Sequence, residues 1–272
     1  MSRRQSNMYP HEGEFPLLIL RKRGPIGLAS IIRMSPDLDT FLKLLTKHFS
    51  TRTLQRIAVR SSLQSSSPYW HLYRRCIITG TLAKRIISQN LKNENNPKLN
   101  RSITKFFPSN FSNEATQYGC DNEKRALETF LKIFKTQHND VKVHTTGVVL
   151  YPPAPYIGGS PDAILTCQCH TESFLVELKC PFRLRLTGIS NWPLLEYFDQ
   201  SQNLKKNHTY TNQINLYQGI LGIKTAFFVV YAKDEVIIKM INFDENFFTF
   251  QVENIQNYYT KHYLPTVIGK RI

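Results

Sequence analysis

The chain has 272 residues, of which 41% are hydrophobic and 20% charged, enough for one large globular domain or two small ones. No apolar run approaches the length of a membrane span, and the apolar stretch at 15–20 is too short for a secretory signal, so we expect neither a membrane partner nor secretion. Five cysteines without a framework spacing favour a reducing compartment, and we therefore expect an intracellular protein of the nucleus or the cytoplasm.

The net charge of +15 is concentrated in the first part of the chain. Residues 1–110 hold 19 Lys and Arg against 5 Asp and Glu, whereas residues 111–272 hold 16 against 15. This asymmetry favours a polyanionic partner that contacts mainly the N-terminal part, and nucleic acid is the partner we expect. A basic solvated surface without a specific ligand is the alternative.

Helical and extended patterns follow one another along the chain. A helical pattern covers 35–65, opened by Ser35-Pro36-Asp37, and another opens at Thr79-Gly80-Thr81. Residues 90–110 are rich in Asn, Lys and Pro, which is typical of an exposed loop. The other predicted elements are a helix at 113–136, strands at 141–150, 163–166 and 174–178, a helix at 209–221, a hairpin of 226–231 with 236–241, and a closing helix at 247–263. This order predicts a mixed α/β fold.

One acidic residue occupies the expected core face of the helix at 113–136. Glu123 shares that face, at helical spacing, with Gly119, Ala126 and Phe130. A carboxylate that faces a core is costly unless a cation or a metal ion accompanies it. Glu123 is therefore a candidate site residue, and a structural ion pair is the alternative.

Three further charged residues are predicted to meet on two neighbouring strands. Asp162 follows a Gly-Gly-Ser-Pro turn and begins one strand, while Glu177 and Lys179 lie two residues apart on the next and point to the same side. If 163–166 pairs with 174–178, Asp162 lies near Glu177. A solvated hairpin with surface charges is the alternative.

Two carboxylates and an ammonium group in one place suit phosphodiester cleavage. Carboxylate oxygens are ligands that Mg²⁺ and Mn²⁺ prefer, and such an ion polarises a phosphate and lowers the pKa of a bound water. Lys179 could orient that water and stabilise the developing negative charge. Glu-x-Lys alone is a weak motif, but Asp162 at strand spacing and Glu123 upstream make the set more specific.

Together with two flanking motifs, these residues resemble the YqaJ-like viral recombinase family, the phage lambda exonuclease family of PD-(D/E)XK nucleases. The matching motifs are Trp70–Arg74 with Ile78–Thr81, Gly119 with Glu123 and Ala126, Ser160–Asp162, Glu177–Phe182, and Asn207–Gln213. The resemblance covers about 52–262. We therefore divide the chain into an N-terminal extension, 1–50, partly helical or disordered, and an exonuclease domain, 51–265.

The resemblance implies a restriction-endonuclease-like core, in which a mixed central sheet is flanked by helices, with an extra N-terminal helical region. It implies a 5′-to-3′ exonuclease that acts on duplex DNA ends in viral or mobile-element recombination, using two Mg²⁺ or Mn²⁺ ions. Family members can form rings, so a homo-oligomer and a recombination partner protein are further expected partners.

The resemblance also implies a role for each matching residue. Asp162 and Glu177 bind metal with the backbone carbonyl of Leu178, and Glu123 binds a second ion or its water. Lys179 activates the nucleophile, and Gln213 positions the lysine or the water. Arg74 and Thr81 hold a DNA phosphate, in the family the terminal 5′-phosphate; an arginine fork and a hydroxyl at a helix N-terminus suit that ligand.

Two other functions remain open at this point. One is a structure-specific endonuclease built on the same core. The other is a catalytically inert DNA-binding protein that serves recombination, although the intact Asp, Glu and Lys set argues against it.

Some further residues are weighed and given less importance. Cys167, Cys169, His170 and Cys180 suggest zinc, but C-x-C-H is not a standard ligand spacing, and we favour ordinary buried cysteines. The histidines lack a paired nucleophile, which argues against a serine or cysteine hydrolase; they include His71, His138, His144 and His208. Trp70 and Tyr73 could stack on DNA bases, but we favour core packing.

Overall fold

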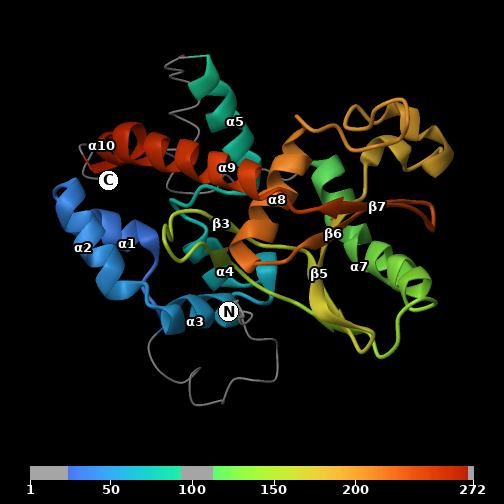
Figure 1. Ribbon diagram of the computed structural model, residues 1–272, viewed down its shortest axis with the longest axis horizontal. Coiled ribbons are helices and arrows are strands. Elements are labelled where there is room, and N and C mark those ends of the chain that lie inside the picture. The colour runs from blue at the N-terminus through green and yellow to red at the C-terminus, as the bar shows by residue number, and fades with distance from the viewer. Residues whose placement is uncertain (1–23, 93–112, 269–272) are drawn as a thin grey trace.

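The computed structural model describes residues 24–92 and 113–268 and contains a central sheet with helices on both of its faces (Figure 1). Most of the loop predicted at 90–110, and the first 23 residues of the expected extension, lie outside the described residues. Within the described ranges, no helix combines the length and the apolar character that a membrane crossing requires.

Five strands form the central sheet in the order β1-β4-β5-β6-β7, with β5 and β6 parallel and the other neighbours antiparallel. Ala163 lies opposite Val176, so the predicted pairing of the two site strands is confirmed. The predicted hairpin is confirmed as well, and its turn residues Lys233 and Asp234 have the positive φ that a tight hairpin requires. The strands are β1 (Lys142–His144), β4 (Ala163–Cys167), β5 (His170–Lys179), β6 (Thr225–Ala232) and β7 (Glu235–Asn242).

A different helix covers each face of this sheet. Val176 and Leu178 pack in one hydrophobic cluster with Phe130 of α7 (Glu114–Phe134). Leu175 points the other way, into the cluster that contains Ile214 of α8 (Thr209–Leu221). Because residues two apart on a strand share a face, Glu177 and Lys179 lie on the α8 side with Leu175. The predicted arrangement of a mixed sheet between helices is confirmed.

Helix α8 begins and ends where the sequence predicts. The His208 side chain accepts a hydrogen bond from the Tyr210 N–H at the start of the helix. Gly222 ends it with φ of 70°, a left-handed conformation that glycine adopts without strain. This definition matters because α8 carries Gln213.

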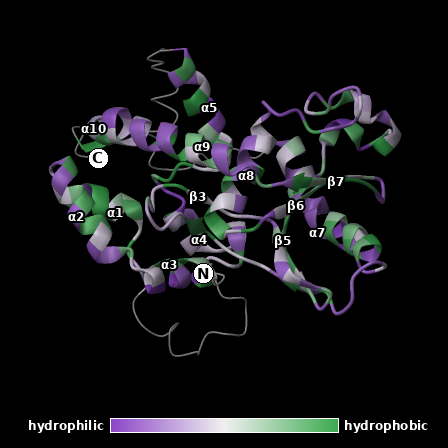
Figure 2. Ribbon diagram, in the orientation of Figure 1, coloured by the Kyte–Doolittle hydropathy of each residue, from purple (hydrophilic) through white to green (hydrophobic). Residues whose placement is uncertain are grey.

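The remaining helices pack against α8 and against one another in the larger hydrophobic cluster, which includes Ile31, Phe41 and Ile57 from the N-terminal part of the chain. In Figure 2, α2 and α7 carry hydrophobic and hydrophilic residues in alternation, as amphipathic surface helices do. The helices are α1 (Leu28–Met34), α2 (Leu38–His48), α3 (Thr51–Arg60), α4 (Pro68–Tyr73), α5 (Gly80–Leu91), α9 (Glu245–Tyr258) and α10 (Leu264–Ile268), with short helical turns η2 (Gln64–Ser66), η3 (Phe182–Leu184), η4 (Ile189–Leu194) and η5 (Tyr259–Tyr263).

The helical pattern predicted at 35–65 is divided in the structure. Asp37, and not Ser35, caps α2, because its side chain accepts from the Thr40 N–H at 2.7 Å, and Ser50 then starts α3. The closing helix predicted at 247–263 begins earlier, at Glu245, because Asp244 caps it, and a π-helical turn follows Tyr258. Helix α1 was not predicted, because a segment of seven residues is too short to show a clear helical period.

The single strand predicted at 141–150 is wrong. Its first part is β1, in the central sheet, whereas its end is β2 (Val149–Leu150), which pairs with β3 (Gly158–Gly159) in a separate sheet. Between them the chain turns to α3, where the Val148 N–H donates to Ser61 Oγ at 2.8 Å. A Cβ on Gly147 would lie 2.2 Å from Ser61 Oγ, so only glycine allows this close approach.

Candidate active site

The centre of the candidate site is the carboxylate of Glu177 on β5, whose side chain is 1% exposed. Its Oε1 accepts hydrogen bonds from Lys179 Nζ at 2.6 Å and from Gln213 Nε2 at 2.6 Å. Its Oε2 is buried and has no hydrogen-bond partner among the described residues. One oxygen is therefore held from two elements, β5 and α8, while the other is left available.

Asp162 reaches the same place from the adjacent strand. It directly precedes β4, and its Oδ2 accepts a hydrogen bond from the Leu178 N–H at 2.7 Å. The antiparallel register of β4 and β5 explains this contact, because Ala163 already lies opposite Val176. The predicted meeting of Asp162, Glu177 and Lys179 is therefore present in the fold.

The carboxyl group of Glu123 lies within electrostatic range of Asp162 and Lys179, but its side chain does not face the core as the helical spacing predicted. Its side chain is exposed, and the buried residues of α7 are Ala126, Phe130 and Phe134, all on the C-terminal side of Glu123. Desolvation around its carboxyl group and the charge of Asp162 nevertheless raise the pKa of Glu123 to about 7. The correction is that Glu123 approaches the site at the end of the packed helix face and not from within the core.

The acids of the site perturb one another. Burial, and next the charge of Asp162, raise the pKa of Glu177 to about 7 against the opposing effect of Lys179. Burial also raises the pKa of Asp162. Burial acts to lower the pKa of Lys179, but the charges of Glu177 and Asp162 outweigh it and leave that pKa raised. Three carboxyl groups thus share one ammonium group, which leaves an excess of negative charge.

This donor set fits a divalent cation. Glu177 Oε2 is a buried acceptor that no described residue satisfies, and a buried carboxylate oxygen is costly unless a cation or a donor satisfies it. Glu123 and Asp162 add carboxylate oxygens nearby, and oxygen donors suit Mg²⁺ and Mn²⁺. The residues that could hold such an ion are Asp162, Glu177 and Glu123.

Two residues of α8 surround the lysine and the glutamate. Gln213 donates to Glu177, and the Tyr210 ring lies 4.9 Å from Lys179 Nζ, at cation–π distance. The N-terminus of α5 is packed against this part of α8, because a Cβ on Gly80 would lie only 2.6 Å from Gln213 Cα. Gly80 therefore lets the two helices approach and sets the position of Gln213.

The predicted phosphate-binding residues lie on the same side of the sheet. Arg74 donates from Nη1 to Ser160 Oγ at 3.2 Å and stacks on Trp70 at 4.3 Å. Burial lowers the pKa of Arg74, while Tyr217 and the charge of Glu177 act to raise it, so its guanidinium lies within electrostatic range of the site. Thr81 is exposed in the first turn of α5, one residue after Gly80.

The two aromatic residues before Arg74 have different surroundings. Tyr73 is 2% exposed and belongs to the core, so the core-packing interpretation is confirmed for it. Trp70 is only partly buried, and its Nε1 donates to Ser160 Oγ at 2.7 Å. Trp70 and Ser160 together hold the Arg74 guanidinium in place.

Three neighbours of the site were missed from the sequence, although a signal for each existed. Tyr210 and Tyr217 lie three residues before and four residues after Gln213, so all three share one face of α8. Ser160 lies two residues before Asp162 in an extended segment, which places both on one side. Spacing around the predicted site residues would have found them.

Solved structures with the same fold include one bacterial and one viral exonuclease. LHK-Exo, an alkaline exonuclease from Laribacter hongkongensis, has a TM-score of 0.54 at 19% identity, over 74% of this chain and 94% of that chain. The Shutoff and Exonuclease Protein of Kaposi's sarcoma-associated herpesvirus, SOX, has a TM-score of 0.56 at 11% identity, over 80% of this chain and 74% of that chain. At these identities the likeness shows the fold, which is the PD-(D/E)XK fold predicted above.

Sequence comparison gives the family. A search of curated proteins finds no match. Residues 69–223, more than half of the chain, match the YqaJ-like viral recombinase domain. This segment runs from α4, which Arg74 follows, to the end of α8, which carries Gln213, and so contains all the candidate site residues. Sequence and fold agree, and the chain belongs to the YqaJ-like viral recombinase domain family.

Proposed function

We propose that the protein is a metal-dependent deoxyribonuclease that digests duplex DNA from its ends. The observation that carries the proposal is the hydrogen-bonded set of Lys179, Gln213 and Glu177, with Asp162 at the start of the adjacent strand and Glu177 Oε2 without a partner in the described part of the chain. This set unites acidic oxygen donors with one cation, which phosphodiester hydrolysis requires.

Asp162 and Glu177 would hold a Mg²⁺ or Mn²⁺ ion, with Glu123 serving a second ion or its water. The backbone carbonyl oxygen of Leu178 is a further possible metal ligand. The Leu178 N–H donates to Asp162, and the N–H and C=O of one strand residue face the same neighbouring strand. When bound, the ions would supply Lewis-acid stabilisation of phosphate charge and a water of lowered pKa.

Lys179 and Gln213 act on the attacking water and the phosphate. Lys179 brings a positive charge whose position is set by Glu177 Oε1 and the Tyr210 ring. A cation held in this way can orient the water and stabilise the negative charge that develops on the phosphate oxygens. Gln213 is a positioning residue, because it reaches the lysine through the shared oxygen of Glu177.

Arg74 is the residue we assign to a DNA phosphate, and Thr81 supports it. Arg74 lies within electrostatic range of Glu177 yet is anchored by neutral partners, Ser160 and Trp70, so it retains the charge to bind an anion. The Thr81 hydroxyl lies in the first turn of α5, where free backbone N–H groups also favour an anion. A terminal 5′-phosphate bound there would give digestion a 5′-to-3′ direction.

Nucleic acid as the partner has two further supports. The chain carries a net charge of +15, which favours binding to a phosphate backbone. Among proteins of the same fold, LHK-Exo has been crystallised with dAMP and SOX with DNA, at TM-scores of 0.54 and 0.55.

Digestion of matched DNA substrates tests the proposal. The protein with Mg²⁺ is expected to degrade linear duplex DNA and to leave covalently closed circular DNA intact, and to prefer 5′-phosphorylated over 5′-hydroxyl ends. Arg74→Ala is expected to weaken that preference by about 10-fold or more, since one charged hydrogen-bond partner is lost. Cutting of the closed circle would instead establish an endonuclease, and DNA binding without any Mg²⁺-dependent or Mn²⁺-dependent cleavage would establish an inert binding protein.

The contact between Gly80 and Gln213 gives a separate prediction. Gly80→Ala places a Cβ against the Gln213 backbone and is expected to lower kcat about 10–100-fold, because small displacements of a positioning residue are costly to catalysis. Gly119→Ala on α7 is the matched stability control: its Cβ meets no atom within 4 Å, so unfolding should become harder by about 0.5–1 kcal/mol. Unchanged kcat in Gly80→Ala would remove the assigned role of this contact.

A further inference from the structure

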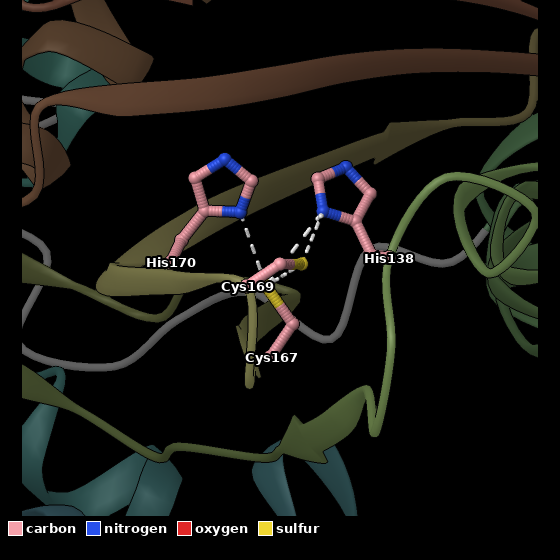
Figure 3. A group of neighbouring side chains, drawn as sticks. All are labelled: His138, Cys167, Cys169 and His170. Atoms are coloured by element: carbon pink, nitrogen blue, oxygen red, sulfur yellow. Dashed lines mark hydrogen bonds between the residues drawn. The ribbon is translucent and has the colours of Figure 1, made fainter.

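A second cluster of metal-ligating side chains lies at the other end of the site strands. His138, Cys167, Cys169 and His170 have their ligand atoms all within 4.8 Å of one another. Figure 3 shows the two imidazole rings turning Nδ1 toward the two sulfur atoms. Cys167 ends β4, Cys169 lies in the turn, His170 begins β5, and His138 follows the end of α7.

The spacing of these atoms is that of a tetrahedral metal site. Cys167 Sγ lies 3.7 Å from His138 Nδ1, 3.3 Å from His170 Nδ1 and 3.3 Å from Cys169 Sγ, and Cys169 Sγ lies 3.4 Å from His138 Nδ1. Zinc bonds of about 2.1 Å to nitrogen and about 2.3 Å to sulfur place tetrahedral donors roughly 3.3–3.8 Å apart. Four of the six distances between donor atoms therefore lie within or close to the range of tetrahedral zinc coordination.

The surrounding structure holds the imidazoles in this arrangement. The His138 ring stacks on Phe134 with centroids 3.9 Å apart, and the His170 ring lies edge-on to Phe174 at 5.2 Å. Backbone contacts link the two segments as well, because the Gln168 N–H donates to the Asn139 carbonyl at 3.0 Å. The donors thus come from two segments that the fold already joins, which lowers the entropy cost of closing a metal site.

We propose that His138, Cys167, Cys169 and His170 form a structural Zn²⁺ site. Two thiolates and two imidazoles select zinc over Mg²⁺, Mn²⁺ and Ca²⁺, which prefer oxygen donors. All four positions are filled by protein, as in structural sites, whereas catalytic zinc keeps one position open. Cys167 and Cys169 are free thiols in the structure, so both are available as ligands.

The proposed zinc site is separate from the candidate active site and would stabilise the fold. His170 and Glu177 are seven residues apart on β5, which corresponds to roughly 23 Å along an extended strand. A bound Zn²⁺ would fasten the end of α7, which carries Glu123, to the hairpin of β4 and β5, which carries Asp162 and Glu177. The ion would thereby stabilise the packing of α7 against the β4–β5 hairpin, the elements that position those acids.

This proposal departs from the sequence-based interpretation, which gave less weight to zinc and considered Cys180 as a further donor. His138 provides the fourth ligand instead, from 29 residues before Cys167. Cys180 lies next to the candidate active site, where burial, and next the charge of Glu123, raise its pKa to about 12.

Metal analysis of the full chain tests the proposal. Protein purified under reducing conditions and dialysed against Mg²⁺ is expected to retain about one Zn²⁺ per chain, and Cys167→Ser/Cys169→Ser to retain none. Co²⁺ in its place should give the sulfur-to-cobalt charge-transfer absorption of a tetrahedral thiolate site. A strong chelator should lower the Tm of the unmodified protein by about 5 °C or more and leave that of the double variant unchanged.

Matched variants separate this site from the active site. Glu177→Gln should keep the Zn²⁺, as should Cys120→Ser, which alters an exposed cysteine outside the cluster. If the double variant does not fold, His170→Asn changes an exposed residue and should weaken Zn²⁺ binding by about 100-fold or more, measured by competition with a chromophoric chelator. Protein purified under reducing conditions that holds no Zn²⁺, or zinc that is lost in Glu177→Gln but kept in the cysteine variant, would overturn the proposal.

Discussion

Replacing Glu177 by Gln is expected to lower Mg²⁺-dependent cleavage of linear duplex DNA by at least about 10³-fold. The amide keeps the shape of the side chain, and its oxygen can still accept from Lys179 and Gln213. The group that replaces Oε2, to which no described residue donates, is however an NH₂ that cannot bind a cation. The single-turnover rate with saturating enzyme measures the loss without interference from binding.

Glu172→Gln is the matched control for this change. Glu172 lies on the same strand, β5, but is exposed and outside the site. Its replacement should leave the cleavage rate within about 2-fold of the original, since exposed substitutions away from a site have small effects. Equal rates for the two variants would sink the proposed metal-binding role of Glu177.

Replacing Lys179 by Met is expected to abolish cleavage and also to destabilise the fold. Lys179 is 22% exposed and Glu177 only 1%, so removing the lysine leaves a buried carboxylate without its cation. Breaking a buried ion pair in this way costs about 3 kcal/mol, the lower end of the usual range because the lysine is partly solvated. Denaturant unfolding in the presence of a chelator measures the stability, and the digestion assay measures the activity.

The double variant Glu177→Gln/Lys179→Met distinguishes the two effects. With both charges removed, part of the lost stability should return, because Glu177 no longer places a carboxylate without its cation in the core, whereas Asp162 still lacks the charge of Lys179. Activity should stay absent, because both the metal ligand and the cation are missing. A double variant as unstable as Lys179→Met alone would mean that the unpaired Glu177 carboxylate does not account for the loss.

Some of this site is predictable from the sequence because it depends on short-range geometry. The two-residue period of a strand places Glu177 and Lys179 together, opposite Val176 and Leu178, and the structure has them so. The helix that carries Gln213 has clear signals at both ends, a capping His208 and Gly222.

Other parts of the structure were predicted wrongly, because contacts between distant segments of the chain overrode the local sequence pattern. The alternation of residues at 141–150 predicts one strand. In the structure the Ser61 hydroxyl accepts a hydrogen bond from the Val148 N–H, and the segment is divided into two strands. Glu123 shares the helical face of Ala126, yet the face is buried only from Ala126 onward, since the period of a helix says nothing about how far its neighbour extends.

By itself, the sequence determined which side chains share a strand or helix face, and through its motifs it identified the family. Only the tertiary structure decided which of these faces meet. It brought Gln213 onto Glu177 through the packing of α8 on the sheet, and it brought His138 to Cys167 from the far end of α7. The physical reason is that backbone periodicity acts over a few residues, whereas the burial of apolar surface joins segments far apart in the chain.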